Sequence, residues 1–568
     1  RSPMVKLSQA YLDGINQFIA DGPTPIEFYL TGLEKRPFTL KDVYNTVGYM
    51  AFSFALAHKT DPLLSNIKNK LAPAYLRDLE VDVDSGTTLI PNYKPSPNDS
   101  VPDQIAALVA EVMKKVPLPQ FEGSNSWVIA PQKTKNGQVI LANDPHIGFA
   151  QPSVWYEAHV STPKYEKYGY HLAGIPFPLL GHDRKLAYGI TMFENDDIDF
   201  YYEEENPLDS TSYKTPDGWR KYGVITRTIK VKDGKDVPFT YKKTVHGPIF
   251  NGILEKVPGE RPVAMSWVYT KLENKVMDAL YGITHAQNLS EFKAALPDIH
   301  APGLNMMYGD ALGNIAWFAT AKLYKMPDST HTKFILDGST GKEEPLEYLD
   351  FSENPMAINP PWHYVYSANN QPDSIAGMLY PGYYLPENRA RRIVKLLEPK
   401  DDWSKEDVEM MLLDEVSDVN TGIITDLAKS MDVKELTEKQ IMVLDKINAW
   451  QGDNELDSIA PTIFHRWVYE LLKNTFEDEL GPDMFQQMLS THFHKRMIAP
   501  MAKKENSVWW DDIRTKDTVE TKKDMVNHAF KAAVLSLEAD FGPDKKLWTW
   551  DKVHTLEHGH PIGNIKAL

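Results

Sequence analysis

Gly123-Ser124 brings together a hydroxyl nucleophile and a residue without a side chain. Glycine has no Cβ, so the peptide bond before Ser124 can adopt unusual backbone angles and be approached closely. A serine hydroxyl placed there can attack the preceding carbonyl, form an ester and release itself as a new N-terminus. Its α-amine would have a pKa of about 7.7–8.0, against about 10.4 for a lysine amine, so it can accept a proton near neutral pH. One residue would then supply both nucleophile and base.

The elements that must position Ser124 form a predicted hairpin. Residues 126–130 alternate as a half-buried strand, Asn136-Gly137 is a strong turn signal, and residues 139–142 supply the return strand. Ser124 would therefore stand at the start of a central hairpin. Taken alone, Gly-Ser-Asn is more typical of an ordinary turn before a strand, so these three residues by themselves do not identify a nucleophile.

Further short motifs follow in order along the chain. They are Asn-Asp-Pro-His at 143–146, Gly-His-Asp at 181–183 with Ala-Tyr-Gly-Ile-Thr at 187–191, Asn-Asp-Asp-Ile-Asp-Phe at 195–200, Thr-Val-His-Gly-Pro-Ile at 244–249, Tyr-Gly-Asp-Ala-Leu-Gly-Asn-Ile at 308–315, Ser-Ala-Asn-Asn-Gln-Pro at 367–372 and Asn-Arg-Ala-Arg-Arg-Ile at 388–393. With Gly-Ser-Asn-Ser-Trp-Val-Ile at 123–129, they resemble the penicillin acylase family of N-terminal-nucleophile hydrolases, from about Leu7 to the last residue.

The resemblance implies an α+β fold, a four-layer αββα sandwich with a helical insertion region. It implies an α-subunit part at residues 1–84 and a linker or spacer peptide at 85–123. A β-subunit would follow at 124–568, strand-rich over 124–394 and helical over 395–550. It also implies family segments before Leu7 and beyond the His-Pro-Ile-Gly at 560–563 that this sequence does not contain.

The resemblance assigns the acyl-transfer chemistry to a few positions. Ser124 would attack the amide carbonyl, and its own amine would carry the proton to the leaving group. The backbone N–H of Met192 and the side-chain amide of Asn369 would stabilise the oxyanion.

Three more residues match family positions around the nucleophile. His146 falls where a backbone carbonyl lies near the terminal amine, Asn125 would orient neighbouring backbone, and Arg389 would hold the surroundings of the amine or meet a substrate carboxylate. An ion pair at a helix start is the structural alternative for Arg389. A Ser-His-Asp triad using His146 or His182 is disfavoured, since no G-x-S-x-G surrounds any serine.

Three aspartates crowd into four residues at Asp196, Asp197 and Asp199. Such carboxylates repel one another unless they are solvated or bind a cation, and oxygen ligands suit calcium. By resemblance, structural calcium would bind Asp196, the carbonyl of Ile198 and Asp199, with Asp61 as a weak candidate from the α-subunit.

Two other metal positions are less well supported. A later family aspartate ligand has no clear match near Met378. His554, His558 and His560 have a spacing that zinc would tolerate, but no cysteine supports such a site. No organic cofactor is expected.

A set of apolar residues near the motifs would line an acyl pocket, although core packing explains each equally well. They are Ile147, Phe149, Phe177, Leu180 and Phe193. Glu194 stands where some family members carry an apolar pocket residue, so the acyl specificity does not follow from the resemblance.

Composition excludes several classes of function. A chain of 568 residues with a net charge of −17 lacks the basic face that nucleic acid requires. The absence of cysteine excludes disulfides, thiol catalysis and zinc–thiolate sites. No apolar run reaches the ~18–20 residues of a membrane span, and residues 1–4 do not begin a signal peptide. A periplasmic or secreted bacterial protein is expected.

Periodicity predicts helices at both ends of the chain and strands between them. Helical spacing appears at Leu7–Ala20, at Val43–His58 behind a capping segment that starts at Thr39, and at Gln104–Val116 after a Gly/Pro/Asn/Ser-rich linker at 85–103. Residues 124 to about 250 favour strands. Later helices are predicted at 405–413, 437–450, 458–472 and 525–541.

These features predict an amidohydrolase that cleaves itself between Gly123 and Ser124 and hydrolyses N-acylated small molecules through an acyl-enzyme. β-Lactams and N-acyl-homoserine lactones are the expected substrate classes, and the cleaved precursor would give a heterodimer of α and β chains. The alternatives are a non-catalytic exported binding protein on the same fold, and an ordinary serine hydrolase or glycan-active protein.

Overall fold

The computed structural model describes residues 2–79, 81, 87–91, 121–251, 261–374 and 379–563. The predicted helix at 104–116, most of the predicted linker and spacer, and Met378 lie outside these residues. No described helix has the length and apolar character needed to cross a membrane.

The predicted hairpin is present and lies at the centre of the molecule. β1 (Phe121–Ile129) pairs antiparallel with β2 (Ile140–Ile147) on one side and with β20 (Tyr364–Ser367) on the other. Gly137 takes a φ of 67° in the connection, which explains the Asn-Gly turn. Because side chains alternate along a strand, Val128 faces one side of this three-stranded sheet while Trp127 and Ile129 face the other.

The second sheet has seven antiparallel strands. In spatial order they are β19 (Met356–Ile358), β15 (Ile315–Thr320), β14 (Leu304–Asp310), β6 (Leu186–Met192), β5 (Leu180–His182), β4 (Tyr165–Leu172) and β3 (Trp155–Thr162). Val128 of the small sheet packs with Met307 and Trp317 of the large one. The two sheets therefore lie face to face over a shared apolar core.

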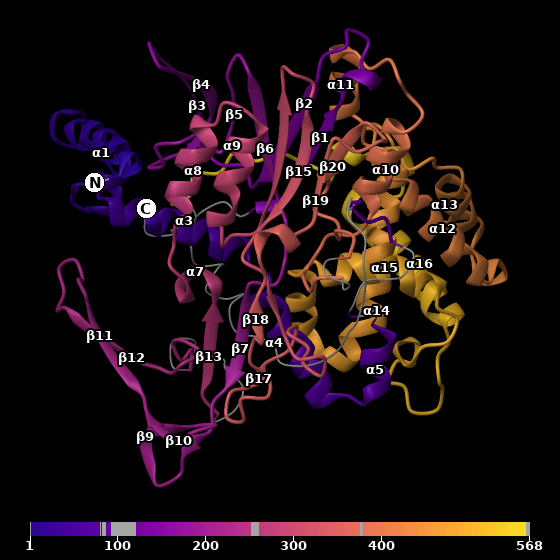
Figure 1. Ribbon diagram of the computed structural model, residues 1–568. Coiled ribbons are helices and arrows are strands. Elements are labelled where there is room, and N and C mark those ends of the chain that lie inside the picture. Colours follow the sequence, from indigo (N-terminus) through magenta and orange to yellow (C-terminus); the bar gives the residue numbers. More distant parts are fainter. Residues whose placement is uncertain are drawn as a thin grey trace.

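Helices cover both outer faces (Figure 1). The large sheet is covered by α1 (Pro3–Asp21), α3 (Leu40–Phe54), α8 (Val276–His285) and α9 (Leu289–Ala295). The small sheet is covered by α10 (Asn388–Leu397) and α11 (Lys405–Leu412). The predicted αββα order of layers is confirmed.

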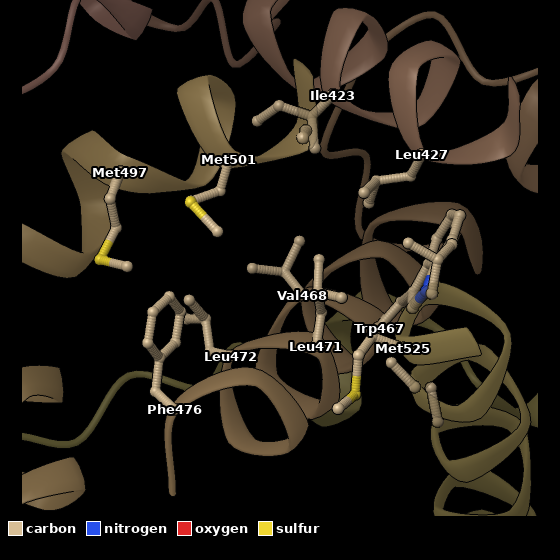
Figure 2. Packing of buried hydrophobic residues seen from close by; sticks show 14 of the residues in the cluster. Ile423, Leu427, Trp467, Val468, Leu471, Leu472, Phe476, Met497, Met501 and Met525 are labelled. Carbon is tan, nitrogen blue, oxygen red and sulfur yellow. The ribbon is translucent and has the colours of Figure 1, made fainter. Parts of the chain in front are cut away.

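A helical region follows the sandwich. It contains α12 (Asp418–Ser430), α13 (Glu438–Asn448), α14 (Ala460–Leu489), α15 (Phe493–Lys503) and α16 (Lys522–Phe541). Figure 2 shows its core, where Met497 and Met501 of α15 face Leu472 and Phe476 of α14. The helices predicted at 405–413, 437–450 and 525–541 are confirmed. The one predicted at 458–472 is present, but α14 continues to Leu489 with a break at Gly481. α12 and α15 were not predicted.

Another predicted helix is also wrong in extent. The helix expected at 43–58 ends at Phe54, and a new helix, α4 (Ala57–Lys70), begins after Ala55 takes an extended conformation. His58 Nε2 lies 3.0 Å from the carbonyl oxygen of Phe52, so its imidazole satisfies a carbonyl at the end of α3. Apolar periodicity carried no signal for this break, after which α4 packs against α14 of the helical region. The short α5 (Pro73–Asp78) follows α4.

Below the sandwich, β7 (Ile198–Tyr202) lies between β13 (Val263–Trp267) and β17 (Leu336–Asp337). The strands β8 (Glu205–Asn206), β9 (Asp209–Thr215), β10 (Gly218–Lys221), β11 (Gly223–Ile229) and β12 (Val237–Lys243) extend from it as an arm (Figure 1). The remaining short elements are α2 (Ile26–Thr31), α7 (Val268–Lys271), β16 (Tyr324–Lys325) and β18 (Glu347–Tyr348).

Candidate active site

Ser124 is fully buried near the start of β1, between the two sheets. Its hydroxyl lies 3.4 Å from the backbone nitrogen of Met192 and 3.5 Å from Nδ2 of Asn369, and both are N–H donors. Its backbone nitrogen donates to Oδ1 of Asn369 at 2.6 Å. One asparagine therefore contacts both the hydroxyl oxygen of Ser124 and the nitrogen that the predicted cleavage would turn into an amine.

Besides Ser124 on β1, Asn369 contacts groups on two further elements. Its Nδ2 donates to the carbonyl of Met192 at the end of β6 (2.8 Å), and its Oδ1 accepts from Nη2 of Arg389 on α10 (3.1 Å). Its φ of 62° is in the left-handed region, which asparagine tolerates better than most residues. The Arg389 contact fixes which end of the amide faces the Ser124 hydroxyl.

Arg389 is bound to the backbone around the predicted cleavage point. Its Nη1 donates to the carbonyl of Ser124 at 2.7 Å and to the side chain of Asn125. Burial lowers the pKa of this guanidinium to about 10, while Asp144 and Glu194 act against the shift. The structural alternative for Arg389, an ion pair at a helix start, is not what the described residues form: each of its hydrogen bonds goes to the site.

Sequence reasoning missed two residues that hold the strands around Ser124. Asn305 on β14 donates through Nδ2 to the carbonyl of Met192 at 2.9 Å and accepts from the indole of Trp317. Asn143 on β2 donates to the carbonyls of Asn125 and Ile190 and accepts from the nitrogen of Ile190, which joins the two sheets. Asn143 stood inside a quoted motif, whereas Asn305 carried no sequence signal.

The glycine of the Ala-Tyr-Gly motif leaves room for Asn143. A Cβ at Gly189 would lie 2.5 Å from Oδ1 of Asn143, closer than real side chains approach. Packing against Asn143 therefore explains why the motif has a glycine at residue 189.

His146 and Asn125 both contact Asp144, another residue that sequence reasoning did not single out. Nε2 of His146 lies 3.2 Å from one Asp144 oxygen, and the backbone nitrogen of Asn125 donates to the other at 3.1 Å. The backbone of His146 is opposite Gly123 in the hairpin. This places the His146 main chain, and not a histidine base, beside the predicted cleavage point.

A cavity of about 1150 Å³ opens next to Ser124. Glu122, His146, Leu385 and Arg389 belong to its wall, together with parts of α12, α14 and α15. Its volume exceeds the roughly 300–1,000 Å³ typical of small-molecule sites. With the chain continuous through Gly123, residues 122 and 123 separate the buried Ser124 from this space.

The predicted acyl-pocket residues divide into two groups. Ile147 and Phe149 line the cavity, and Phe149 is 64% exposed. Phe177 and Leu180 do not line it; both pack in the core between the large sheet and its helices, so their expected role is corrected. Phe193 is likewise in a core, between the sheets, where its ring lies 6.1 Å from that of Tyr384, a cavity-lining residue. Nearness in sequence to a motif did not reveal which face of a sheet each side chain takes.

Glu194 lies deep beside the site. Its side chain is inaccessible to solvent, with Oε2 2.9 Å from Nδ1 of His492 and Oε1 without a hydrogen-bond partner among the described residues. A glutamate at this position differs from the apolar pocket residue that some family members carry there, as the sequence indicated.

The aspartate cluster is buried and poorly compensated. Burial, reinforced by neighbouring carboxylates, raises the pKa of Asp196 well above its usual value, and burial raises that of Asp199 to about 6 despite a 2.8 Å hydrogen bond from Tyr324. Asp61 on α4 accepts from the hydroxyl of Tyr383, and its pKa is raised by burial and then by Asp196.

Several buried carboxylate oxygens of this cluster lack hydrogen-bond partners. Both oxygens of Asp196 and one each of Asp61 and Asp199 accept no hydrogen bond within the described part of the chain. Asp197 is buried too, and burial raises its pKa to about 7. Asp61 of α4, Asp196 just before β7 and Asp199 of β7 thus bring carboxylate oxygens into one region.

No group of three or more His, Cys, Asp or Glu side chains among the described residues is arranged to hold a metal ion by side chains alone. The three C-terminal histidines have separate surroundings: His554 stacks on Trp550, His558 makes an edge-to-face contact with Phe149, and His560 lies 3.1 Å from Glu27. The zinc alternative therefore has no support in the structure.

Comparison with known proteins gives the family. The family model described as penicillin amidase matches residues 2–568. The chain belongs to the penicillin amidase family. Its order of motifs and its αββα layers are those expected of that membership.

Among penicillin amidase relatives, an acyl-homoserine lactone acylase, QuiP of Pseudomonas aeruginosa, is 26% identical over 76% of this chain and 54% of its own length. Penicillin acylase 2 proenzyme of a Pseudomonas species is 24% identical over 88% of this chain and 64% of its own. The chain thus spans about half to two thirds of the length of these relatives. A thermostable penicillin G acylase from Alcaligenes faecalis shares the fold, with a TM-score of 0.62 and 21% identity over 75% of this chain and 80% of that one.

Proposed function

We propose that this chain is an N-terminal serine amidohydrolase that cleaves itself between Gly123 and Ser124 and then hydrolyses the amide bond of an N-acylated small molecule. One observation carries the proposal: the Ser124 hydroxyl lies between two N–H donors, of Met192 and Asn369, while its own nitrogen contacts the same asparagine. The names of relatives, which specify acyl-homoserine lactones and penicillins, support N-acyl-homoserine lactones or β-lactams as substrate classes.

The surroundings of Gly123 suit self-cleavage. A Cβ there would lie 3.1 Å from Nη2 of Arg389 and 3.3 Å from Oδ1 of Asn369, so the scissile peptide is enclosed by polar groups that a larger residue would disturb. Attack of the Ser124 hydroxyl on the Gly123 carbonyl would form an ester and break the Gly123–Ser124 peptide bond, which frees the amine of Ser124. Water would then hydrolyse the ester to the Gly123 carboxylate and the Ser124 hydroxyl. Departure of residues 122 and 123 would open Ser124 to the cavity.

Turnover would use the same groups. The Ser124 hydroxyl attacks the substrate carbonyl, its proton passes to the Ser124 amine, and the amine returns it to the leaving nitrogen. The Met192 N–H and Asn369 Nδ2, which lie 3.4 and 3.5 Å from the Ser124 hydroxyl, would stabilise the oxyanion, a contribution typically worth about 10²–10³ in rate per donor. Water then hydrolyses the acyl-enzyme to free acid and enzyme.

The two chains would remain together after cleavage. Segments before residue 80 are part of the common cores: Leu12 and Val47 pack with the large sheet, and Leu63 and Leu64 pack in the helical region. Separating them would expose this apolar surface. A heterodimer of α and β chains is therefore the proposed assembly.

We also propose a structural calcium ion at the aspartate cluster, with Asp196, the Ile198 carbonyl, Asp199 and Asp61 as ligands. The three carboxylates are not arranged as a metal site in the described chain, so they would have to draw together around the ion. The unpartnered oxygens of these carboxylates support it, because buried like charges need a counter-charge. The cation would neutralise the cluster and tie α4 to β7.

Two measurements on one protein and one variant test the function. Intact-mass analysis of the wild type should show a larger chain that begins at Ser124, and acyl p-nitroanilides should be hydrolysed. Ser124→Ala should lose both. A protein that stays in one piece, binds acyl amides and keeps that binding in Ser124→Ala would instead be the non-catalytic alternative, and faster hydrolysis of simple esters or glycosides than of amides would favour the other rival class.

A further inference from the structure

Two residues of the site have left-handed backbones, and each is linked to an oxyanion donor. Asn369, which supplies one donor itself, has a φ of 62° that asparagine tolerates. Glu194 has a φ of 60° and follows Met192, the source of the other donor, by two residues. A residue such as glutamate keeps this conformation only where its surroundings hold it there. The contacts of Glu194 therefore bear on the position of the Met192 N–H.

One short segment, from Tyr383 to Leu385, connects these two positions. The backbone nitrogen of Tyr383 donates to the carbonyl oxygen of Glu194 at 2.9 Å. Two residues further on, the nitrogen of Leu385 donates to the carbonyl oxygen of Asn369, also at 2.9 Å. The hydroxyl of Tyr383 donates to Asp61 on α4 at 2.5 Å, so the segment is anchored at a third point. The backbones that carry the two oxyanion donors are thus joined through this segment.

The imidazole of His492, just before α15, contacts both sides of this connection. Its Nδ1 lies 2.9 Å from Oε2 of Glu194 and 3.3 Å from the carbonyl oxygen of Tyr383. A carboxylate and a carbonyl oxygen are both acceptors, so Nδ1 carries the hydrogen and donates. The side chain of Glu194 is 0% exposed and that of His492 is 11% exposed, so water cannot readily replace this donor. The other Glu194 oxygen has no hydrogen-bond partner in the described part of the chain, which leaves His492 as the group that holds the carboxylate.

These contacts give His492 a role at the site although it lies outside the cavity. We infer that His492 is a positioning residue, which holds both oxyanion donors at the Ser124 hydroxyl through its contacts with Glu194 and the Tyr383 segment. The inference rests on the proposed function, because the donors matter only for the oxyanion of that reaction. His492 is not among the described residues of the cavity wall, so its loss should impair the chemical step and spare substrate binding.

Two substitutions of His492 test this role. His492→Phe removes the donor and keeps a planar ring, whereas His492→Asn keeps an N–H at the position of Nδ1. A change of Glu194 would be less specific, because the charge of Glu194 also acts on the pKa of Arg389. For an acyl p-nitroanilide we expect His492→Phe to lower kcat about tenfold with KM within about twofold, which is less than the loss of a whole donor because the donors are displaced and not removed. His492→Asn should restore kcat to within about threefold of wild type.

Inhibitor binding separates the position of the donors from the shape of the cavity. An alkylboronic acid with the chain length of the best acyl anilide can form a tetrahedral adduct with a serine hydroxyl, in which a boron-bound oxygen takes the place of the oxyanion. Its Ki should rise about tenfold in His492→Phe and recover in His492→Asn. The carboxylic acid of the same chain length forms no such adduct, so it should bind to all three proteins within about twofold. Equal weakening of both ligands would place the effect in the cavity and overturn the inference.

The matched control is the same substitution at another histidine of the helical region. His528 is exposed on α16, and His528→Phe should leave kcat, KM and both inhibition constants at the wild-type values. All measurements are made well below the unfolding temperatures of the variants, on protein whose cleavage at Ser124 has been checked by mass.

The outcomes distinguish this inference from the proposed function. If cleaved wild-type protein hydrolyses no acyl anilide, the proposed function fails. If the wild type is active but His492→Phe keeps kcat within twofold, or loses activity only through KM, the positioning role alone is overturned. A His492→Asn variant as impaired as His492→Phe would also overturn it, because the donor would then not be the feature that matters.

A crystal structure of His492→Phe gives a readout that needs neither turnover nor self-cleavage. The Met192 nitrogen, Asn369 Nδ2 or both should lie further from the Ser124 hydroxyl than the present 3.4 and 3.5 Å, with β1 in its original place. If both distances are unchanged, His492 does not position the donors, whatever the kinetics of the variant.

Discussion

Replacing Asn369 tests the proposed oxyanion site most directly, because the effect of losing its side-chain amide can be separated from the effect of its backbone conformation. Its φ of 62° would cost a residue with a Cβ about 1–2 kcal/mol, whereas glycine adopts it freely. Asn369→Gly therefore removes the amide without backbone strain, and Asn369→Ala removes it with strain. Both leave Nη2 of Arg389 and the carbonyl of Met192 without one partner.

The expected loss follows from the contacts at Ser124. Nδ2 of Asn369 is one of two N–H donors within 3.5 Å of the hydroxyl, so removing it should lower kcat about 10²–10³-fold, or about 3–4 kcal/mol, with little change in KM. The two variants should be equally impaired in kcat, although Asn369→Ala should unfold at a lower temperature than Asn369→Gly.

The assay is hydrolysis of an acyl p-nitroanilide by protein whose cleavage at Ser124 has been checked by mass. Measurements well below both unfolding temperatures keep stability out of the comparison. A glycine variant that retains kcat within fivefold would refute the oxyanion role of Asn369. A kcat that tracks the difference in stability between the two variants would show that Asn369 acts through the fold alone.

Three further outcomes are expected. Gly123→Ala should accumulate uncleaved chain in intact-mass spectra, because the added Cβ crowds Arg389; normal cleavage would contradict this. His246 should make stability fall as pH rises: burial alone would lower its pKa, but Glu203 and Glu344 outweigh burial and raise it to about 9. Since the folded pKa exceeds the unfolded value of 6.5, this contribution of about 3 kcal/mol is complete below pH 6.5 and lost as pH rises through about 9. Thermal unfolding of His246→Gln against pH should lack that slope. Chelation should lower the unfolding temperature of wild type, with recovery on adding calcium, and Asp61→Asn should respond less; identical responses would exclude Asp61 as a ligand.

Local features of the chain could be predicted from the sequence without knowledge of the fold. The alternation in residues 126–130 and the Asn136-Gly137 turn specify a hairpin, since a strand pattern and its turn involve only neighbouring residues. The capping segment at Thr39 forms the capping box that begins α3. The position of Ser124 at the start of this hairpin followed from the same local signals.

Contacts between side chains that belong to different layers could not be predicted from the sequence. Apolar periodicity continues through Ala55, so no sequence signal indicated that α3 ends there and that Asp61 lies near Asp196. Phe177 and Leu180 are apolar residues beside a motif, and only the packing of helices on the large sheet decides that they face away from the cavity.

By itself, the sequence determined the candidate nucleophile, its hairpin and the order of the motifs, because these depend on residue type and on contacts within a few positions. The tertiary structure decided which groups surround Ser124. Asn369, Met192 and Arg389 reach Ser124 from separate elements, and Lys495 reaches the cavity from a helix about 370 residues further along the chain. Such meetings depend on how layers pack, and no local pattern encodes them.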